Sequence, residues 1–371
     1  VTNTSIGACF SILEDKNLIH PPIEVLVTRD EETGLYGAAA LEPGILKAKY
    51  LINVDSEEWK SVCIGCAGGF TYNIKHEIVK EKNSNDIITK QFVLRGLNGG
   101  HSGVNIDLGR INAITMMGRL LASAKEINFN VCQVIGGTAH NGIPRDCTAV
   151  VSIHKALSDK FDALVNNEYN KVKVEYAKID PNVSIEITTI PFQPYMNTIE
   201  SLRLINFLNG FICGPIRWSP DVAGLVDTSH NLGVIKITDT HIEMVGSCRA
   251  FAQSQLDWMY TWVKSITQTT GYIISDKIGE YPGWKPEPDN DLNRIMKEET
   301  RDAYGCEPKI YAIHAGLECG LFMGKYPGLI CTSIGPEINF PHSPNERLLI
   351  KSVTPFYRSL VNLSKVLTKL L

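Results

Sequence analysis

The stretch Tyr50-Leu-Ile-Asn-Val-Asp-Ser-Glu-Glu58 places a short apolar run directly before a group of acids. Its β-branched and aliphatic residues predict a buried strand over Tyr50–Val54. Upstream, Ile23–Arg29 has the same character and is followed by Asp30-Glu31-Glu32, while the small residues of Gly37–Leu46 between the two runs favour a helix. Buried strands that alternate with helices predict a mostly parallel sheet covered on both faces.

The pattern changes from about residue 90 and returns to alternation in the last hundred residues. The middle stretch predicts strands with helices grouped between them, which is typical of an α+β domain. We therefore expect a catalytic-type α/β domain, with a phosphorylase/hydrolase-like mixed sheet and helices on both faces, split by an inserted α+β domain. The expected parts are residues 1–87, 88–268 and 269–371, and the first part looks incomplete at its N-terminus.

Individual elements follow from the periodicity of apolar residues. The further strands that we expect are Gln91–Arg95, Val131–Thr138, Cys147–Ile153, Val183–Ile190, Leu232–Thr238, Ile242–Cys248, Tyr272–Ile278, Lys309–Ile313 and Leu329–Ile334. The further helices that we expect are Leu108–Ala124, Leu157–Tyr176, Ile199–Leu208, Leu256–Ile266, Leu292–Tyr304 capped by Asp289 or Asn290, and Val353–Leu370.

Composition narrows the class of protein. Among 371 residues, 44% are apolar, and 36 basic against 40 acidic side chains give a net charge of −4, which argues against a nucleic-acid binder. No apolar run approaches the ~18 residues that span a bilayer, so we expect a soluble cytoplasmic protein without a membrane span. The ten cysteines are scattered, and Cys63-Ile-Gly-Cys66 is interpreted as buried thiols, with a redox or zinc role as the alternative.

Acids and a histidine follow several predicted strands. Glu31 and Glu32 follow Ile23–Arg29, Asp55 follows Tyr50–Val54, and His342 lies in a Pro-stiffened loop after the strand that ends at Ile334. Because ligands of open α/β sheets bind at the carboxyl ends of strands, these groups are placed to hold a cation, and carboxylates with an imidazole suit zinc. Solvated loops and a strand cap are the alternatives.

The remaining candidates are spread over both expected domains. His101 lies between glycines in Gly99-Gly100-His-Ser-Gly103, and Asn141 and Arg145 lie in Asn141-Gly-Ile-Pro-Arg145. Plain turns would explain both segments equally well. His314 and Glu318 follow the predicted strand Lys309–Ile313 and are candidates to position ligands or substrate.

Taken together, these segments resemble the zinc-dependent dipeptidases that cleave Xaa-His peptides, the carnosinase-like aminoacyl-histidine dipeptidases of the aminoacylase and carboxypeptidase G-like metallopeptidase family. The resemblance covers nearly the whole sequence, and His314-Ala-Gly-Leu-Glu-Cys-Gly-Leu-Phe322 is its most specific string. It implies that the inserted domain is a lid that pairs two chains into a homodimer, and that the substrate is a small peptide.

The resemblance also assigns roles to residues. It implies Glu31 as general base, Glu32, Asp55 and His342 as ligands of two zinc ions, and His101 as an oxyanion-stabilising group lent to the partner chain. Asn141, Arg145 and Arg249 would contact the substrate carboxylate or the oxyanion, and His314 and Glu318 would lie around the site. Two cations would polarise the scissile carbonyl and activate a bridging water.

The sequence departs from the family pattern at two places. No His-x-Asp occurs in it, and Asn3 stands where the resemblance calls for an Asp that bridges the two cations. The missing His is expected upstream of Val1, but a neutral amide at position 3 bridges dications poorly. We therefore expect impaired peptidase activity. The alternative hypothesis is an inactive relative that serves as a structural or binding subunit of a larger assembly. A dinucleotide-dependent enzyme is disfavoured because no Gly-x-Gly-x-x-Gly opens a helix after the first strand.

Overall fold

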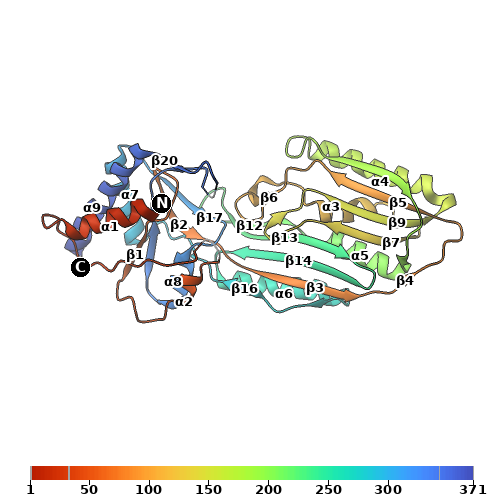
Figure 1. Cartoon of the computed structure of the whole chain (residues 1–371), viewed down its shortest axis with the longest axis horizontal. Coiled ribbons are helices and arrows are strands. Elements are labelled where there is room, and N and C mark those ends of the chain that lie inside the picture. The colour runs from red at the N-terminus through yellow and green to blue at the C-terminus, as the bar shows by residue number, and fades with distance from the viewer. Residues whose placement is uncertain (1, 32–33, 342, 371) are drawn as a thin grey trace. The chain divides into compact units, whose positions relative to one another are not determined.

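The computed structural model describes residues 2–31, 34–341 and 343–370, and the chain divides into two compact units (Figure 1). Unit 1 comprises Val1–Gly68, Ser219–Leu225 and Tyr281–Leu371; unit 2 comprises Gly69–Trp218 and Val226–Glu280. The boundaries that we expected near residues 88 and 268 lie inside unit 2. The flanking segments β3 (Gly68–Glu77) and β15 (Ile273–Ile274) pair with each other within the large sheet of that unit.

Unit 1 is built on a four-stranded sheet in the order β1-β18-β2-β17. Strands β1 (Tyr50–Asn53) and β18 (Ile330–Ser333) run parallel, as do β2 (Ser61–Cys66) and β17 (Lys309–Ile313). Strands β18 and β2 meet in antiparallel fashion at Ser333 and Cys63. The sheet is therefore mixed, as the sequence predicted.

Helices cover both faces of this sheet. On one side Val62 and Ile64 of β2 share a core with α1 (Thr2–Glu14), α7 (Asp291–Tyr304) and α9 (Val353–Leu370). On the other side Cys63 and Trp284 share a core with α2 (Tyr36–Ala40) and α8 (Glu318–Lys325). The remaining short elements of unit 1 are β19 (Ile338–Asn339), β20 (Arg347–Leu348) and the 3-10 turn Ile350–Ser352.

The interpretation of Cys63 and Cys66 as buried thiols is confirmed. Both side chains are buried in the second core. Burial raises the pKa of Cys63 to about 11 and that of Cys66 to about 12, so both remain protonated thiols near neutral pH.

Two predictions in unit 1 are wrong. Ile23–Arg29 forms no strand, and its apolar side chains are exposed, with Val27 at 63%. A strand needs a neighbour that accepts and donates its backbone hydrogen bonds, and apolar character alone does not supply one. The helix expected over Gly37–Leu46 is confined to α2, because Leu41 is extended and Pro43 has no N–H to continue it.

Unit 2 contains a ten-stranded sheet in the order β10-β5-β9-β7-β13-β14-β3-β15, with β12 beside β13 and β16 beside β3. Its other strands are β5 (Ile87–Arg95), β7 (Phe129–Gly136), β9 (Cys147–His154), β10 (Ser184–Ile190), β12 (Gly214–Trp218), β13 (Val226–Ile237), β14 (His241–Ala250) and β16 (Ile278–Tyr281). Four two-residue strands form two smaller pairings: β4 (Lys80–Glu81) pairs with β11 (Tyr195–Met196), and β6 (Gly100–His101) pairs with β8 (Gly142–Ile143).

The helices of unit 2 are α3 (Ala113–Ala122), α4 (Ser158–Glu175), α5 (Thr198–Gly210) and α6 (Gln253–Thr269), with 3-10 turns at Ile106–Leu108 and Lys155–Leu157. Most predicted strands and helices are confirmed within a few residues. Helix α3 begins later than expected because the side chain of Asn112 caps it, accepting from the N–H groups of Ile114 and Thr115. The cap of α7 is Asn290 rather than Asp289, and Tyr272–Ile278 contributes only β15 and the first residue of β16.

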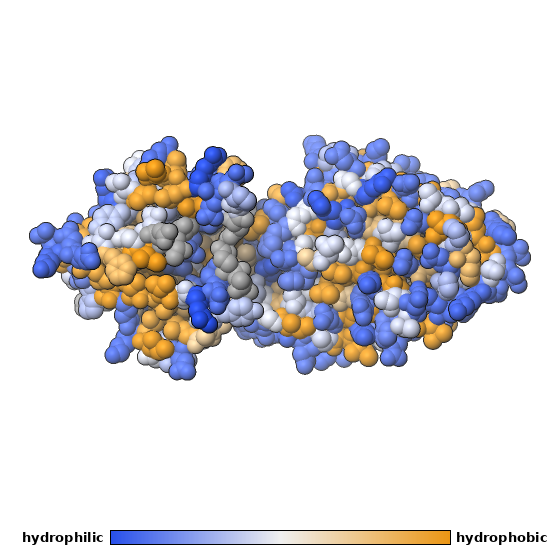
Figure 2. All heavy atoms as spheres, in the orientation of Figure 1, coloured by the Kyte–Doolittle hydropathy of each residue, from blue (hydrophilic) through white to orange (hydrophobic). Residues whose placement is uncertain are grey.

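No helix in residues 2–31, 34–341 and 343–370 is both long and apolar enough to cross a membrane. On the face of unit 2 that Figure 2 shows, hydrophobic side chains are interspersed with hydrophilic ones.

Candidate active site

In unit 2, the two glycine-bounded segments of the sequence lie against each other. Strands β6 and β8 pair in antiparallel fashion, so that His101 is opposite Gly142, and the N–H of Ser102 donates to the carbonyl of Asn141 at 2.8 Å. The structure therefore brings together His101 and Asn141, which are forty residues apart. Both segments also contain the turns that were the alternative: the N–H of Gly142 donates to the carbonyl of Ala139 at 3.2 Å, and that of Asn105 donates to the carbonyl of His101 at 3.1 Å.

The glycines are required by close packing as well as by backbone conformation. Gly99 has φ +60°, and a Cβ there would lie 2.0 Å from Cγ of Arg145. Gly100 has φ +137°, and its Cβ would lie 2.6 Å from Nη1 of Arg110. Only glycine accepts these conformations at this spacing. The pair thus lets Arg145 lie directly beside the backbone that carries His101.

The hydrogen bonds of His101 define its tautomer. Nδ1 accepts from the N–H groups of Gly103 at 3.1 Å and Val104 at 3.2 Å. Burial, together with the positive charge of Arg249 and the neighbouring His140, lowers the pKa of His101. A neutral ring whose Nδ1 accepts carries its proton on Nε2. His101 therefore offers a single N–H donor, which is what an oxyanion requires.

Buried amides hold the loop opposite His101. Nδ2 of Asn231 donates to the carbonyl of Gly142 at 2.8 Å, and Nδ2 of Asn112 donates to Oδ1 of Asn231 at 3.1 Å. Oγ of Ser247 donates to the carbonyl of His140 at 3.2 Å. On β13 and β14, Ser229 pairs with Arg249, so Arg249 lies on the same strand face as these residues.

His140 was not among the residues predicted from the sequence. Burial and the charge of Arg249 lower its pKa, and its own proximity contributes to the lowered pKa of His101. Its place directly before Asn141 was the one available signal. Asn112, Asn231 and Ser247 were also missed, because only the register of the sheet brings them to this loop.

In unit 1, two of the expected acids lie near each other. Oγ1 of Thr28 donates to Oε1 of Glu318 at 2.6 Å. Burial raises the pKa of Glu318, and the negative charge of Asp55 adds to this effect while the hydrogen bond from Thr28 opposes it. Asp55 itself is exposed and Glu31 is half-buried. The end of β1 is fixed by Asn53, whose Oδ1 accepts from Oγ of Ser333 at 2.7 Å and from the N–H of Asp55 at 3.0 Å.

Three residues with left-handed backbone lie near the predicted ligands of unit 1. Asp30, Leu35 and Phe340 have φ of 56°, 58° and 57°, although none of them is glycine. For Leu and Phe this left-handed conformation is unusual and tends to occur at functional sites. The segments concerned lead into Glu31, α2 and Pro341. His314 is buried at the end of β17.

Several predicted ligands cannot be placed. Glu32 and His342 lie outside the described residues, and only the backbone of Asn3 is described, in α1. Among the described residues, no three His, Cys, Asp or Glu side chains are grouped as a metal centre. Asp55 is accessible, and its negative charge raises the pKa of Glu318 less than burial does. The carboxylates of both residues are of a chemical type that suits a divalent cation.

Comparison with known proteins identifies relatives over almost the whole chain. Residues 92–180 match the peptidase dimerisation domain of the M20 family. The chain is 34% identical over 362 residues to the cytosol non-specific dipeptidase of Escherichia coli (strain K12), an alignment that covers 97% of this chain and 74% of that protein. The crystal structure of the aminoacylhistidine dipeptidase from Vibrio alginolyticus matches with a TM-score of 0.93 and 36% identity, over 97% of this chain and 74% of that one.

Proposed function

Because this chain belongs to the M20 peptidase family, together with the dipeptidases just described, we propose that it hydrolyses Xaa-His or similar dipeptides. The observation that carries the proposal is the cluster of polar side chains around His101 in unit 2. Arg249 lies close enough to His101 to lower the pKa of the histidine, and Arg145 packs beside Gly99. A guanidinium and a neutral N–H donor suit a peptide carboxylate and an oxyanion, respectively.

We assign the substrate contacts to unit 2. Arg249, Arg145 and Asn141 would bind the C-terminal carboxylate or the oxyanion, and Nε2–H of His101 would donate to the oxygen that becomes negative. The dimerisation-domain match supports a homodimer, in which His101 would act on substrate bound by the partner chain. The name of the E. coli relative supports a cytoplasmic location.

We assign the proton transfer and the metal to unit 1. Glu31 would take a proton from the attacking water and pass it to the leaving amine, with His314 and Glu318 beside the site. Glu32, Asp55 and His342 would hold zinc, with Asn3 at the bridging position. When bound, zinc would polarise the scissile carbonyl and make water more acidic. Because Asn3 supplies no charge, we propose weak zinc affinity and impaired turnover.

Hydrolysis of Xaa-His dipeptides by the full-length protein, with zinc added, tests the proposal. We expect slow turnover, and we expect Asn3→Asp to raise kcat/KM at least tenfold. Asn17→Asp, on the exposed turn after α1, serves as the matched control and should change nothing. Absence of hydrolysis by the wild type and by Asn3→Asp would reject the proposed activity and favour the inactive-subunit alternative.

A further inference from the structure

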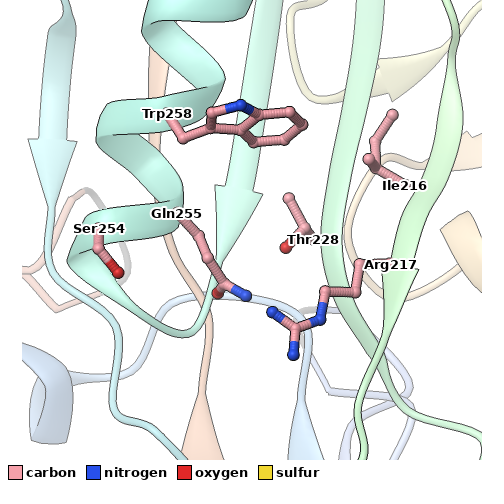
Figure 3. A pocket seen from close by; sticks show the side chains of 6 residues that line it. All are labelled: Ile216, Arg217, Thr228, Ser254, Gln255 and Trp258. Atoms are coloured by element: carbon pink, nitrogen blue, oxygen red, sulfur yellow. The ribbon is translucent and has the colours of Figure 1, made fainter.

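Unit 2 contains a cavity that the proposed reaction does not use. It has a volume of about 410 Å³ and is lined by β12, β13 and α6 through Ile216, Arg217, Thr228, Ser254, Gln255 and Trp258 (Figure 3). This volume is within the usual range for small-molecule sites.

The cavity lies on the opposite face of β13 from the candidate substrate contacts. Thr228 pairs with Ala250, whereas the next residue, Ser229, pairs with Arg249. Because successive side chains of a strand point to opposite faces, Thr228 faces α6 while Ser229 shares the face of Arg249. A ligand in this cavity would therefore not contact the face that carries Arg249.

Thr228 supplies the observation that points to a ligand. Its side chain lines the cavity and the residue is only 2% exposed, yet within the described part of the chain Oγ1 has no hydrogen-bond partner. Buried hydroxyl groups are normally satisfied, so an unpaired one at a cavity wall indicates a missing acceptor or donor.

A guanidinium that is more than half exposed and paired with a carboxylate lies beside this hydroxyl. Nε of Arg217 is 3.3 Å from Oδ2 of Asp227, and the same oxygen accepts from Nε2 of Gln255 at 2.7 Å. Asp227 thereby orients both side chains, and Figure 3 shows the guanidinium, the Gln255 amide and the Thr228 hydroxyl directed toward the same part of the pocket. A guanidinium next to a hydroxyl is suited to a carboxylate.

The rest of the wall is apolar. Trp258 is 52% exposed, an unusual exposure for so large a ring, and its indole stacks on Trp262 with a centroid distance of 6.5 Å and an angle of 18°. Ile216 lies across the pocket on β12. Packing on Trp262 fixes one side of the Trp258 ring and leaves surface for an apolar group of a ligand.

We propose that this cavity binds a small organic monocarboxylate that carries an aromatic or other apolar group. The carboxylate accepts from the guanidinium of Arg217 and from the hydroxyl of Thr228, and the apolar group packs against Trp258 and Ile216. This binding site is independent of the proposed dipeptide hydrolysis.

Calorimetric titration of the full-length protein with phenylacetate tests the proposal. We expect saturable binding with one site per chain, at least tenfold weaker binding of phenylacetamide and of acetate, and at least a tenfold loss in Thr228→Val, which keeps the shape of the side chain. Arg217→Gln and Trp258→Ala should lose affinity similarly, while Lys264→Ala, elsewhere on α6, should not.

Two outcomes overturn the proposal: no binding of phenylacetate by the wild type, or equal binding by Thr228→Val and Arg217→Gln. Thermal melting of each variant separates a local loss from misfolding. His101→Ala should bind phenylacetate like the wild type, so loss of binding in that variant would place the ligand at the proposed active site instead.

Discussion

The two groups of candidate residues are held in different ways. In unit 2, His101 and the loop around Asn141 are fixed by strand pairing and by the buried amides Asn231 and Asn112. In unit 1, Asp55 is exposed and Asp30 has a left-handed backbone with φ 56°. The backbone around His101 is thus held by neutral hydrogen bonds, whereas Asp55 lies exposed after β1 and its negative charge acts on Glu318.

The largest effect is expected for a substitution among the acids of unit 1. Glu31→Gln should lower kcat for dipeptide hydrolysis by roughly 10²–10⁴-fold, because an amide cannot accept the proton of the attacking water. Steady-state kinetics measure it, with Asp30→Asn on the same loop as the control. A kcat within threefold of the wild type would remove Glu31 from the mechanism.

In unit 2, the residue whose substitution should lower kcat most is His101. His101→Ala should lower kcat by roughly 10²-fold while KM changes little, since the N–H donor acts on the transition state. His101→Gln, which keeps an N–H donor, should recover part of the loss, and His154→Gln on the exposed end of β9 is the control. An effect on KM alone would make His101 a substrate-binding group.

A third effect, similar in free energy to that of His101→Ala, concerns the stability of unit 2. His230 is fully buried between the hydroxyl of Tyr72 and the carbonyl of Ile212, each 2.6 Å away, and desolvation lowers its pKa to about 4. The unfolded state, with an ordinary pKa near 6.5, takes up the proton first as pH falls. The free energy of unfolding should therefore decrease by about 3 kcal/mol between pH 7 and pH 4 on account of this group.

Urea unfolding of the wild type and of His230→Gln at several pH values measures this contribution. The variant should show a flatter dependence between pH 6.5 and 4, and His154→Gln should keep the slope of the wild type. Equal slopes for the wild type and His230→Gln would show that His230 is protonated without penalty in the folded protein.

Regular elements could be predicted where periodicity was strong and a partner existed. Strand β9 is confirmed from its alternation and α4 from its helical spacing. Ile23–Arg29 has an equally apolar sequence but no paired neighbour, which a single segment cannot reveal. For the candidate site, the short segments Gly99–Gly103 and Asn141–Arg145 were enough to predict His101, Asn141 and Arg145 as candidates. They could not locate His140 or Asn231, because those contacts arise from strand register and loop packing.

The central claim is that the acids of unit 1 bind divalent ions. Metal analysis of the full-length protein after equilibration with zinc tests it directly, with Asp55→Asn and Asn3→Asp beside the wild type. We predict bound zinc at less than two ions per chain in the wild type, more in Asn3→Asp, and a loss in Asp55→Asn. Zinc binding that is absent from all three proteins, or unchanged by Asp55→Asn, would contradict the claim.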